Sequence, residues 1–206
     1  MGSSFLRQNQ GGYTLIELML SLGISSVLLY GIHGVLMGQQ KAYVQQEQIV
    51  EAQEGLRIAA TLMNREIRMA GYNPTGTADA KIVTAEKEKI HITSDLDGNG
   101  DTIGSNENIT YAVYTKDGIK KLGRTVNGSK APVLEHLESL EFVYRKADGT
   151  PLALKPDGTL VDPAQISQVK KIEIILTART ATADPQYPKN QGYRTRALTS
   201  YISLRN

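Results

Sequence analysis

The first chemical question in this sequence concerns Glu17, a carboxylate that lies just ahead of a long apolar run. Between Leu18 and Met37 there are twenty residues without Asp, Glu, Lys or Arg. A helix of that length measures about 30 Å, which matches the hydrocarbon thickness of a bilayer. A charge in a membrane segment costs a few kcal/mol, so such a residue usually has a partner and a function. We expect both for Glu17.

A second candidate site is the acidic loop at residues 94–107, which has the ligand spacing of a calcium site. The residues with suitable oxygens are Asp95, Asp97, Asn99, Asp101 and Glu107. They match the first part of an EF-hand-type loop, with Gly100 where the sharp turn is needed. The bidentate acid of such a loop falls at Asn106, and Glu107 stands one place later. We expect either a Ca²⁺ ion that stiffens an exposed loop, or a hairpin loop rich in Asp, Asn and Gly for turn chemistry alone.

No catalytic motif accompanies these two sites. The sequence has no nucleophile elbow, Walker loop, Rossmann fingerprint or H-E-x-x-H pattern, and its three histidines are isolated. Cysteine is absent, which excludes disulfides and thiolate metal sites. The net charge is +2 with scattered basic residues, so nothing indicates a nucleic-acid partner. We therefore expect a protein that is not an enzyme.

The segment after the apolar run has the pattern of an amphipathic helix. Apolar residues recur every seven positions at Ile49, Leu56, Met63 and Ala70, which gives one buried face. Gly71 is a suitable C-cap and Pro74 prevents continuation. The sequence therefore predicts one helix from Tyr13 to Ala70.

From Lys81 onward the pattern changes to short strands separated by Asp-Gly and Asn-Gly turns, which tolerate the positive φ of hairpins. The expected strands are Lys81–Ala85, Lys89–Thr93, Asn108–Tyr114, Gly118–Leu122, Ser139–Arg145, Val169–Arg179 and Arg194–Leu204. The expected turns are Asp117-Gly118, Asn127-Gly128, Asp148-Gly149 and Asp157-Gly158. These elements predict an α+β fold, in which a long N-terminal helix packs on a C-terminal antiparallel β-sheet domain.

The stretch GGYTLIELM, residues 11–19, resembles the class III signal of type IV pilins and pseudopilins. The resemblance implies that prepilin peptidase cuts between Gly12 and Tyr13, following the Gly11-Gly12 pair, and that the new terminus is methylated. Glu17 is then the fifth residue of the mature chain. Tyr13 departs from the Phe or Met that is usual at the first position. The alternative is a plain signal anchor with an incidental Glu17.

The resemblance also implies a role and a place for each part of the chain. In a filament, the Glu17 carboxylate would pair with the Tyr13 amine of a neighbouring subunit. Residues 1–12 would be a cleaved leader, 13–40 the transmembrane and filament-core helix, 41–72 its amphipathic half, and 73–206 a β-rich head. The chain would cross the inner membrane once, with a cytoplasmic N-terminus and an extracytoplasmic head, and then enter a pilus or pseudopilus. Its partners would be the prepilin peptidase and methyltransferase, the membrane, and other minor and major pilins through the helix.

Three later stretches resemble a narrower group, the PilW-like minor pilins and the J-type pseudopilins. They are Arg65–Pro74, Glu138–Thr150 and 169–206. We expect a minor type IV pilin that helps to initiate or cap a pilus. The alternatives are a J-type pseudopilin of type II secretion and, from another class, a membrane-anchored calcium-binding adhesion or sensor domain.

Overall fold

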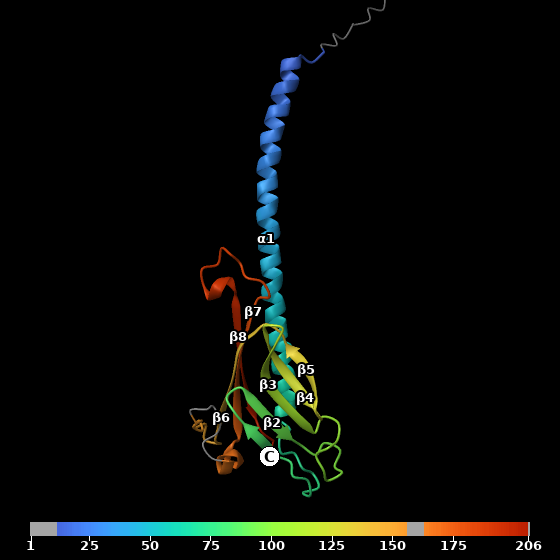
Figure 1. Cartoon of the computed structure of the whole chain (residues 1–206), viewed down its shortest axis with the longest axis vertical. Coiled ribbons are helices and arrows are strands. Elements are labelled where there is room, and N and C mark those ends of the chain that lie inside the picture. The colour runs from blue at the N-terminus through green and yellow to red at the C-terminus, as the bar shows by residue number, and fades with distance from the viewer. Residues whose placement is uncertain (1–11, 156–162, 206) are drawn as a thin grey trace, which may run out of the picture. The chain divides into compact units, whose positions relative to one another are not determined.

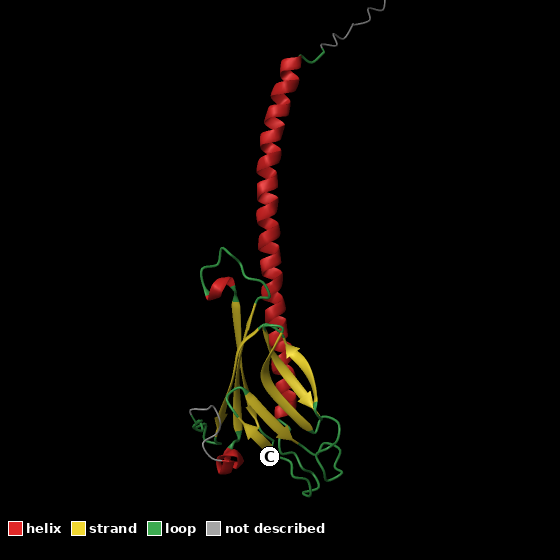
Figure 2. Ribbon diagram, viewed as in Figure 1, coloured by secondary structure: helices red, strands yellow, loops and turns green. Residues whose placement is uncertain are grey.

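The structure is a computed structural model, which describes residues 12–155 and 163–205. The chain divides after Gln46 into two units, residues 1–46 and 47–206, and α1 contributes to both. The helical elements are α1 (Leu15–Ile67), η1 (Pro163–Gln168) and η2 (Asn190–Gly192) (Figure 1). The strands are β1 (Ile82–Ala85), β2 (Lys89–Thr93), β3 (Asn108–Lys116), β4 (Ile119–Val126), β5 (Ser129–Leu134), β6 (Leu137–Arg145), β7 (Lys171–Arg179) and β8 (Thr195–Ser203) (Figure 2).

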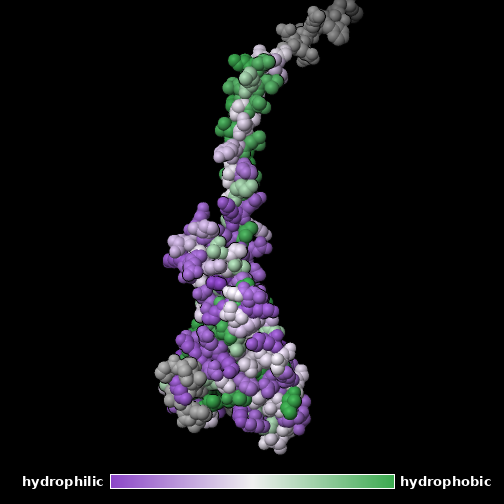
Figure 3. All heavy atoms as spheres, viewed as in Figure 1, coloured by the Kyte–Doolittle hydropathy of each residue, from purple (hydrophilic) through white to green (hydrophobic). Residues whose placement is uncertain are grey.

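The first unit contains the apolar part of α1. Its large hydrophobic side chains, from Leu15 to Met37, are exposed, so they have no apolar partner within the described chain. Figure 3 shows hydrophobic residues gathered along this part of the helix. Among the described residues, α1 is the one helix long and apolar enough to cross a membrane. Its surface therefore suits lipid or other apolar helices, and not water.

In the second unit, α1 buries the face that the seven-residue repeat predicts. Its buried apolar residues are Ile49, Ala52, Leu56, Ala59, Ala60, Met63 and Ile67. Arg65 lies in the last helical turn, where a cation complements the partial negative charge of the helix terminus. Residues 68–71 form turns, and Gly71 has a φ of 78°, which only glycine adopts without strain. The helix therefore ends within three residues of the predicted Ala70.

Two antiparallel sheets carry the rest of the unit. One has five strands in the order β1-β2-β3-β4-β5, and the other has three in the order β6-β7-β8. The Asp117-Gly118 and Asn127-Gly128 pairs both have positive φ at each residue and join consecutive strands. That is the conformation of two-residue hairpin turns. The turn predicted at Asp157-Gly158 lies outside the described residues.

The core lies between the helix and both sheets. It contains the buried face of α1 together with large side chains of the strands, among which Tyr111, Phe142 and Tyr144 are fully buried. The rings of Phe142 and Tyr144 stack with centroids 6.3 Å apart. The α+β class predicted from the sequence is therefore confirmed, with one long helix packed on antiparallel sheets.

One strand was not predicted. β5 contains Pro132, and its first four residues are exposed, so it lacks the apolar alternation of the other strands. It forms because it pairs with β4 across the Asn127-Gly128 turn and lies at the edge of the sheet, where proline is tolerated. Leu134 at its end is buried in the core. A Cβ atom on Gly55 of α1 would lie 2.8 Å from Leu134 Cδ1, so the glycine allows this close approach.

Candidate functional site

The N-terminal end of α1 brings Thr14 and Glu17 together. The backbone N–H of Thr14 donates to Glu17 Oε2 at 2.8 Å, and the Thr14 hydroxyl donates to the same oxygen at 2.9 Å. The Glu17 N–H donates in return to Thr14 Oγ1 at 3.4 Å. This is a capping box, in which the residue before the helix and the third helical residue satisfy each other's backbone donors. The T-x-x-E pattern of residues 14–17 is the sequence signal of this capping box.

The capping box leaves half of the Glu17 carboxylate available. Both bonds from Thr14 end on Oε2, and within the described chain no hydrogen bond reaches Oε1. Tyr13 is 90% exposed, and a shallow groove of about 360 Å³ is lined by Tyr13, Glu17, Leu18 and Ser21. Gly12 is exposed, and Gly11 lies outside the described residues. The arrangement presents a carboxylate oxygen beside the residue that the predicted cut would make the first.

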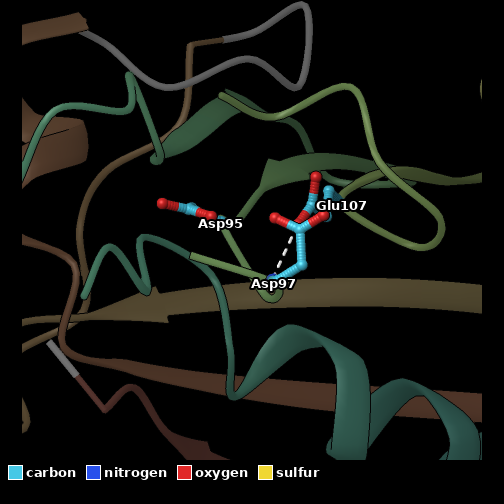
Figure 4. A group of neighbouring side chains, drawn as sticks. All are labelled: Asp95, Asp97 and Glu107. Atoms are coloured by element: carbon cyan, nitrogen blue, oxygen red, sulfur yellow. Dashed lines mark hydrogen bonds between the residues drawn. The ribbon is translucent and has the colours of Figure 1, made fainter. Parts of the chain in front are cut away.

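Three of the predicted calcium ligands lie together between β2 and β3. One oxygen each of Asp95, Asp97 and Glu107 lies within 4.8 Å of the others (Figure 4). Asp95 and Glu107 are buried, whereas Asp97 is exposed. Asp101 is outside this group, and the side chain of Asn99 accepts a hydrogen bond from the Asp101 N–H at 2.8 Å.

The buried acids already accept backbone hydrogen bonds. Glu107 receives the N–H groups of Leu96, Asp97 and Gly104 at 2.6, 3.1 and 2.7 Å. Asp95 similarly receives bonds from the N–H groups of Gly98 and Gly100, and from the Thr75 hydroxyl. These bonds satisfy loop backbone groups that would otherwise be buried without partners. Calcium binding by the loop stays a prediction.

The side chain of Asn106 is directed elsewhere. Its φ is 64°, and its Oδ1 accepts a hydrogen bond at 2.7 Å from Nη2 of Arg124 in β4. Asn106 has an amide and no carboxylate, and Glu107, one place later, is the residue whose carboxylate enters the loop.

A buried charged group at the end of α1 was not anticipated. Glu66, buried on the helix, accepts bonds from Arg124 Nε at 2.8 Å and Nη2 at 2.9 Å, and from the Tyr111 hydroxyl at 2.5 Å. Burial and the adjacent Glu66 carboxylate raise the pKa of Tyr111 well above its usual range. The Glu66 carboxylate also raises the pKa of Arg124. The sequence signal for this pair was weak, since Glu66 differs from other helix glutamates only in lying on the apolar face.

Comparison with known proteins bears on the N-terminal site. The family described as the prokaryotic N-terminal methylation motif matches residues 7–30. Among solved structures, a type IV-like pilin from Thermus thermophilus is similar, with 16% sequence identity and a TM-score of 0.39, over 73% of this chain and 95% of that chain. The search of curated proteins found no match.

The matched motif spans the predicted cut between Gly12 and Tyr13, Glu17, and the first part of the apolar half of α1. The motif implies processing by prepilin peptidase and assembly with other pilins. The apolar helix that carries the motif is long and apolar enough to anchor the chain in a membrane.

Proposed function

We propose that the chain is a minor type IV pilin, which is cut between Gly12 and Tyr13, methylated at Tyr13, and built into a pilus through α1. The observation that carries the proposal is the half-free Glu17 carboxylate beside Tyr13, at the fifth position from the cut. In this role the chain helps to initiate or cap the filament.

The chemistry of assembly follows from the surroundings of Glu17. When apolar helices pack side by side, a carboxylate between them loses its water and needs a positive partner. The Tyr13 amine of a neighbouring subunit supplies one, and Oε1 of Glu17 is free to receive it. The bonds from Thr14 hold the other oxygen and orient the carboxylate before the neighbour arrives. The amine–carboxylate pair then sets the axial register between two subunits.

The placement in the cell follows from the two ends of the apolar run. Arg7 precedes the run, and the positive-inside rule places that end in the cytoplasm. The strand-bearing unit is then outside the cytoplasm.

The proposal of a minor pilin rests on the resemblance of Arg65–Pro74 and of the later strands to PilW-like proteins. The J-type pseudopilin is the alternative that the experiments below separate from it.

Mass spectrometry of the mature chain tests the processing step. We expect a chain that begins at Tyr13 and carries one methyl group on its amine. A mature chain that retains residues 1–12 refutes the proposal.

Two matched substitutions then test the assembly step. Glu17→Gln keeps the shape and the capping box, since glutamine also occupies that position of the box, but removes the charge. Thr14→Val removes the two bonds of the cap that involve the hydroxyl, but it keeps the carboxylate and the backbone N–H that orients it. We expect Glu17→Gln to be strongly depleted from sheared filaments and Thr14→Val to be incorporated. Equal incorporation of Glu17→Gln and wild type contradicts the role of the carboxylate.

A deletion separates the pilus from the secretion system. For a minor pilin, loss of the chain reduces the number of pili on the cell. For a J-type pseudopilin, loss of the chain instead leaves pili in place and stops secretion of exoproteins into the medium.

A further inference from the structure

The outer strand of the three-stranded sheet, β8, has a partner on one side only (Figure 1). It pairs with β7 and with no other strand of the described chain. The Leu204 N–H donates to Lys170 O at 2.9 Å, so the even-numbered residues of β8 direct their backbone groups toward β7. The odd-numbered residues therefore direct theirs away from the sheet. In agreement with this, the Arg205 N–H donates at 3.3 Å to Arg68 O, just beyond the end of α1.

Four residues of β8 have backbone groups without partners on this open side. Within the described residues, no hydrogen bond is made by the backbone N–H or C=O of Ala197, Thr199, Tyr201 or Ser203. Their side chains are all exposed. We name these four residues the β8 edge. A row of unpaired N–H and C=O groups is a template on which an extended segment can add a strand.

The other sheet edges have features that prevent such pairing. β5 contains Lys130 and Pro132, and β1 has four residues with a shift in its register. The Phe142 N–H of β6 donates to Lys87 O at 2.8 Å, so the turn between β1 and β2 covers that edge. β8 has nine residues without proline, lysine or a bulge. Within the described chain, it is therefore the long sheet edge that is left open.

Two arginines of α1 lie beside β8. The Asn64 side chain donates to Ser200 Oγ at 2.7 Å, which places one flank of the helix next to the strand. Arg57 is seven residues before Asn64 and Arg68 is four residues after it, so both lie on the same flank. Both arginines are exposed. The flank of α1 beside β8 is therefore positively charged.

Two further arginines come from β8 and the residues after it. Arg196 directly precedes Ala197, and its side chain donates to the adjacent Thr195 carbonyl at 2.9 Å. Arg205 follows Ser203 by two places and is exposed. Within the described residues, the ion pairs of arginine involve other arginines than these four, and β8 has no acidic residue. The β8 edge thus combines open backbone groups with positive charge at both of its ends.

We propose that the β8 edge binds an extended acidic segment of another protein, which adds a fourth strand to the three-stranded sheet. Main-chain hydrogen bonds to the β8 edge hold the segment, and its acidic side chains meet the arginines at the two ends. Ala197 to Ser203 span about 20 Å, so a segment of that length occupies the whole edge. The inference goes beyond the proposed function and does not depend on it.

The edge strands of a second copy do not match these charges. The strands β1, β5 and β8 have the sequences IVTA, SKAPVL and TRALTSYIS, which contain neither Asp nor Glu. The strand β6 contains glutamates, but it is paired with β7 on one side and covered on the other. Charge complementarity therefore favours a different protein as the occupant.

Peptide binding to the full chain in detergent micelles tests the proposal. The probe is a fluorescein-labelled peptide of about seven residues, with glutamate at both ends and alternating threonine and valine between them. One control peptide has lysine in place of glutamate, and a second has methyl groups on its backbone nitrogens. From fluorescence anisotropy, we expect the probe to bind about tenfold more tightly than either control. Absence of saturable binding, or equal binding of the N-methylated peptide, overturns the proposal.

Substitution at Thr199 locates the bound peptide. Thr199→Pro removes an N–H that faces away from β7, so it blocks an added strand and keeps the pairing of β8 with β7. Thr199→Ala keeps the N–H and is the matched control. We expect the probe to bind Thr199→Pro about tenfold less tightly than Thr199→Ala. Equal affinity for two variants with wild-type circular dichroism overturns the proposal, and if Thr199→Pro is unfolded, the N-methylated peptide on the wild type decides.

Removing the arginines tests the preference for acidic segments. Arg57→Gln/Arg68→Gln should weaken binding of the probe several-fold, and added salt should weaken binding to the wild type. Lys116→Gln/Lys130→Gln is the control, because it removes the same charge from the other sheet. Equal losses in the two double variants show that net charge alone is responsible, and they overturn the proposal.

A peptide with the β8 sequence TRALTSYIS tests pairing between copies of the chain. We expect it to bind no more tightly than the lysine control, because it brings an arginine to an edge that is already positive. Binding as tight as that of the glutamate probe assigns the edge to a second copy and overturns the proposal. Neither result bears on the cut at Tyr13 or on filament assembly, so the two proposals fail separately.

Discussion

Glu66 at the end of α1 and Arg124 in β4 form a two-pronged ion pair, with N–O distances of 2.8 and 2.9 Å. The Arg124 guanidinium also binds Asn106 beside the acidic loop, and the Glu66 carboxylate also binds Tyr111 of β3. One pair of residues thereby connects the helix, the five-stranded sheet and the loop. The arrangement suits arginine, whose planar group donates two parallel bonds to one carboxylate.

Removing one member of this pair should cost more than removing all of it. Arg124→Met leaves the buried Glu66 charge without its cation, and we expect the free energy of unfolding to fall by about 3 kcal/mol. The triple variant Glu66→Met/Arg124→Met/Tyr111→Phe removes every polar member and should lie much closer to wild type. Denaturant unfolding of the full chain in detergent micelles, followed by circular dichroism, measures both. A triple variant less stable than Arg124→Met would contradict this account.

The buried tyrosines should make the protein sensitive to alkali. Burial raises the pKa of both Tyr111 and Tyr144 above the ordinary value of about 10. The folded state then keeps protons that the unfolded state loses, so stability is complete below about pH 10 and falls as the pH rises further. The free energy of unfolding between about pH 9 and pH 11 should show this slope. The Tyr111→Phe/Tyr144→Phe variant should show a shallower slope, and an equal slope would exclude these two groups as its cause.

Gly55 should be needed for the contact between α1 and β5. The added side chain of Gly55→Val meets Leu134 Cδ1, which lies 2.8 Å from the Cβ position, and we expect a loss of about 2 kcal/mol. Gln53→Val is the matched control, because it places the same β-branched residue at an exposed site of the same helix. Leu134→Ala should recover part of the loss in the Gly55→Val background. Equal effects of Gly55→Val and Gln53→Val would show that helix propensity alone is responsible.

The two roles predicted for the acidic loop, calcium binding and stabilisation of the turn, can be measured separately. Glu107→Gln weakens the bonds to three backbone N–H groups and should lower stability by about 2 kcal/mol with or without calcium. A calcium site, in addition, predicts that millimolar calcium raises the Tm of the wild type and not that of Asp97→Asn. The Asp97 side chain is exposed and accepts its bonds from the neighbouring Asn99. A wild-type Tm that responds to neither calcium nor chelator would leave the acids with the turn role alone.

The sequence by itself determined the features that depend on neighbouring residues. The methylation motif, the apolar run and the seven-residue stripe of α1 are patterns within one continuous segment. The same holds for the Asp-Gly and Asn-Gly turns, whose positive φ values are a property of two residues. For this reason the fold class, the helix and seven of the strands were predictable with small errors at their ends.

Only the tertiary structure decided the features that join distant segments. Glu66 and Arg124 are 58 positions apart, and the place of Glu66 on the apolar face of the helix does not indicate which residue reaches it. β5 has no apolar alternation, and it is a strand because β4 lies beside it and Gly55 leaves room for Leu134. Glu107 accepts bonds from the N–H groups of Leu96 and Asp97, which lie eleven and ten positions earlier in the chain. In each case the stabilising contact joins residues that are brought together only when the chain folds. The sequence contains both residues of each contact, but it does not indicate that they are partners.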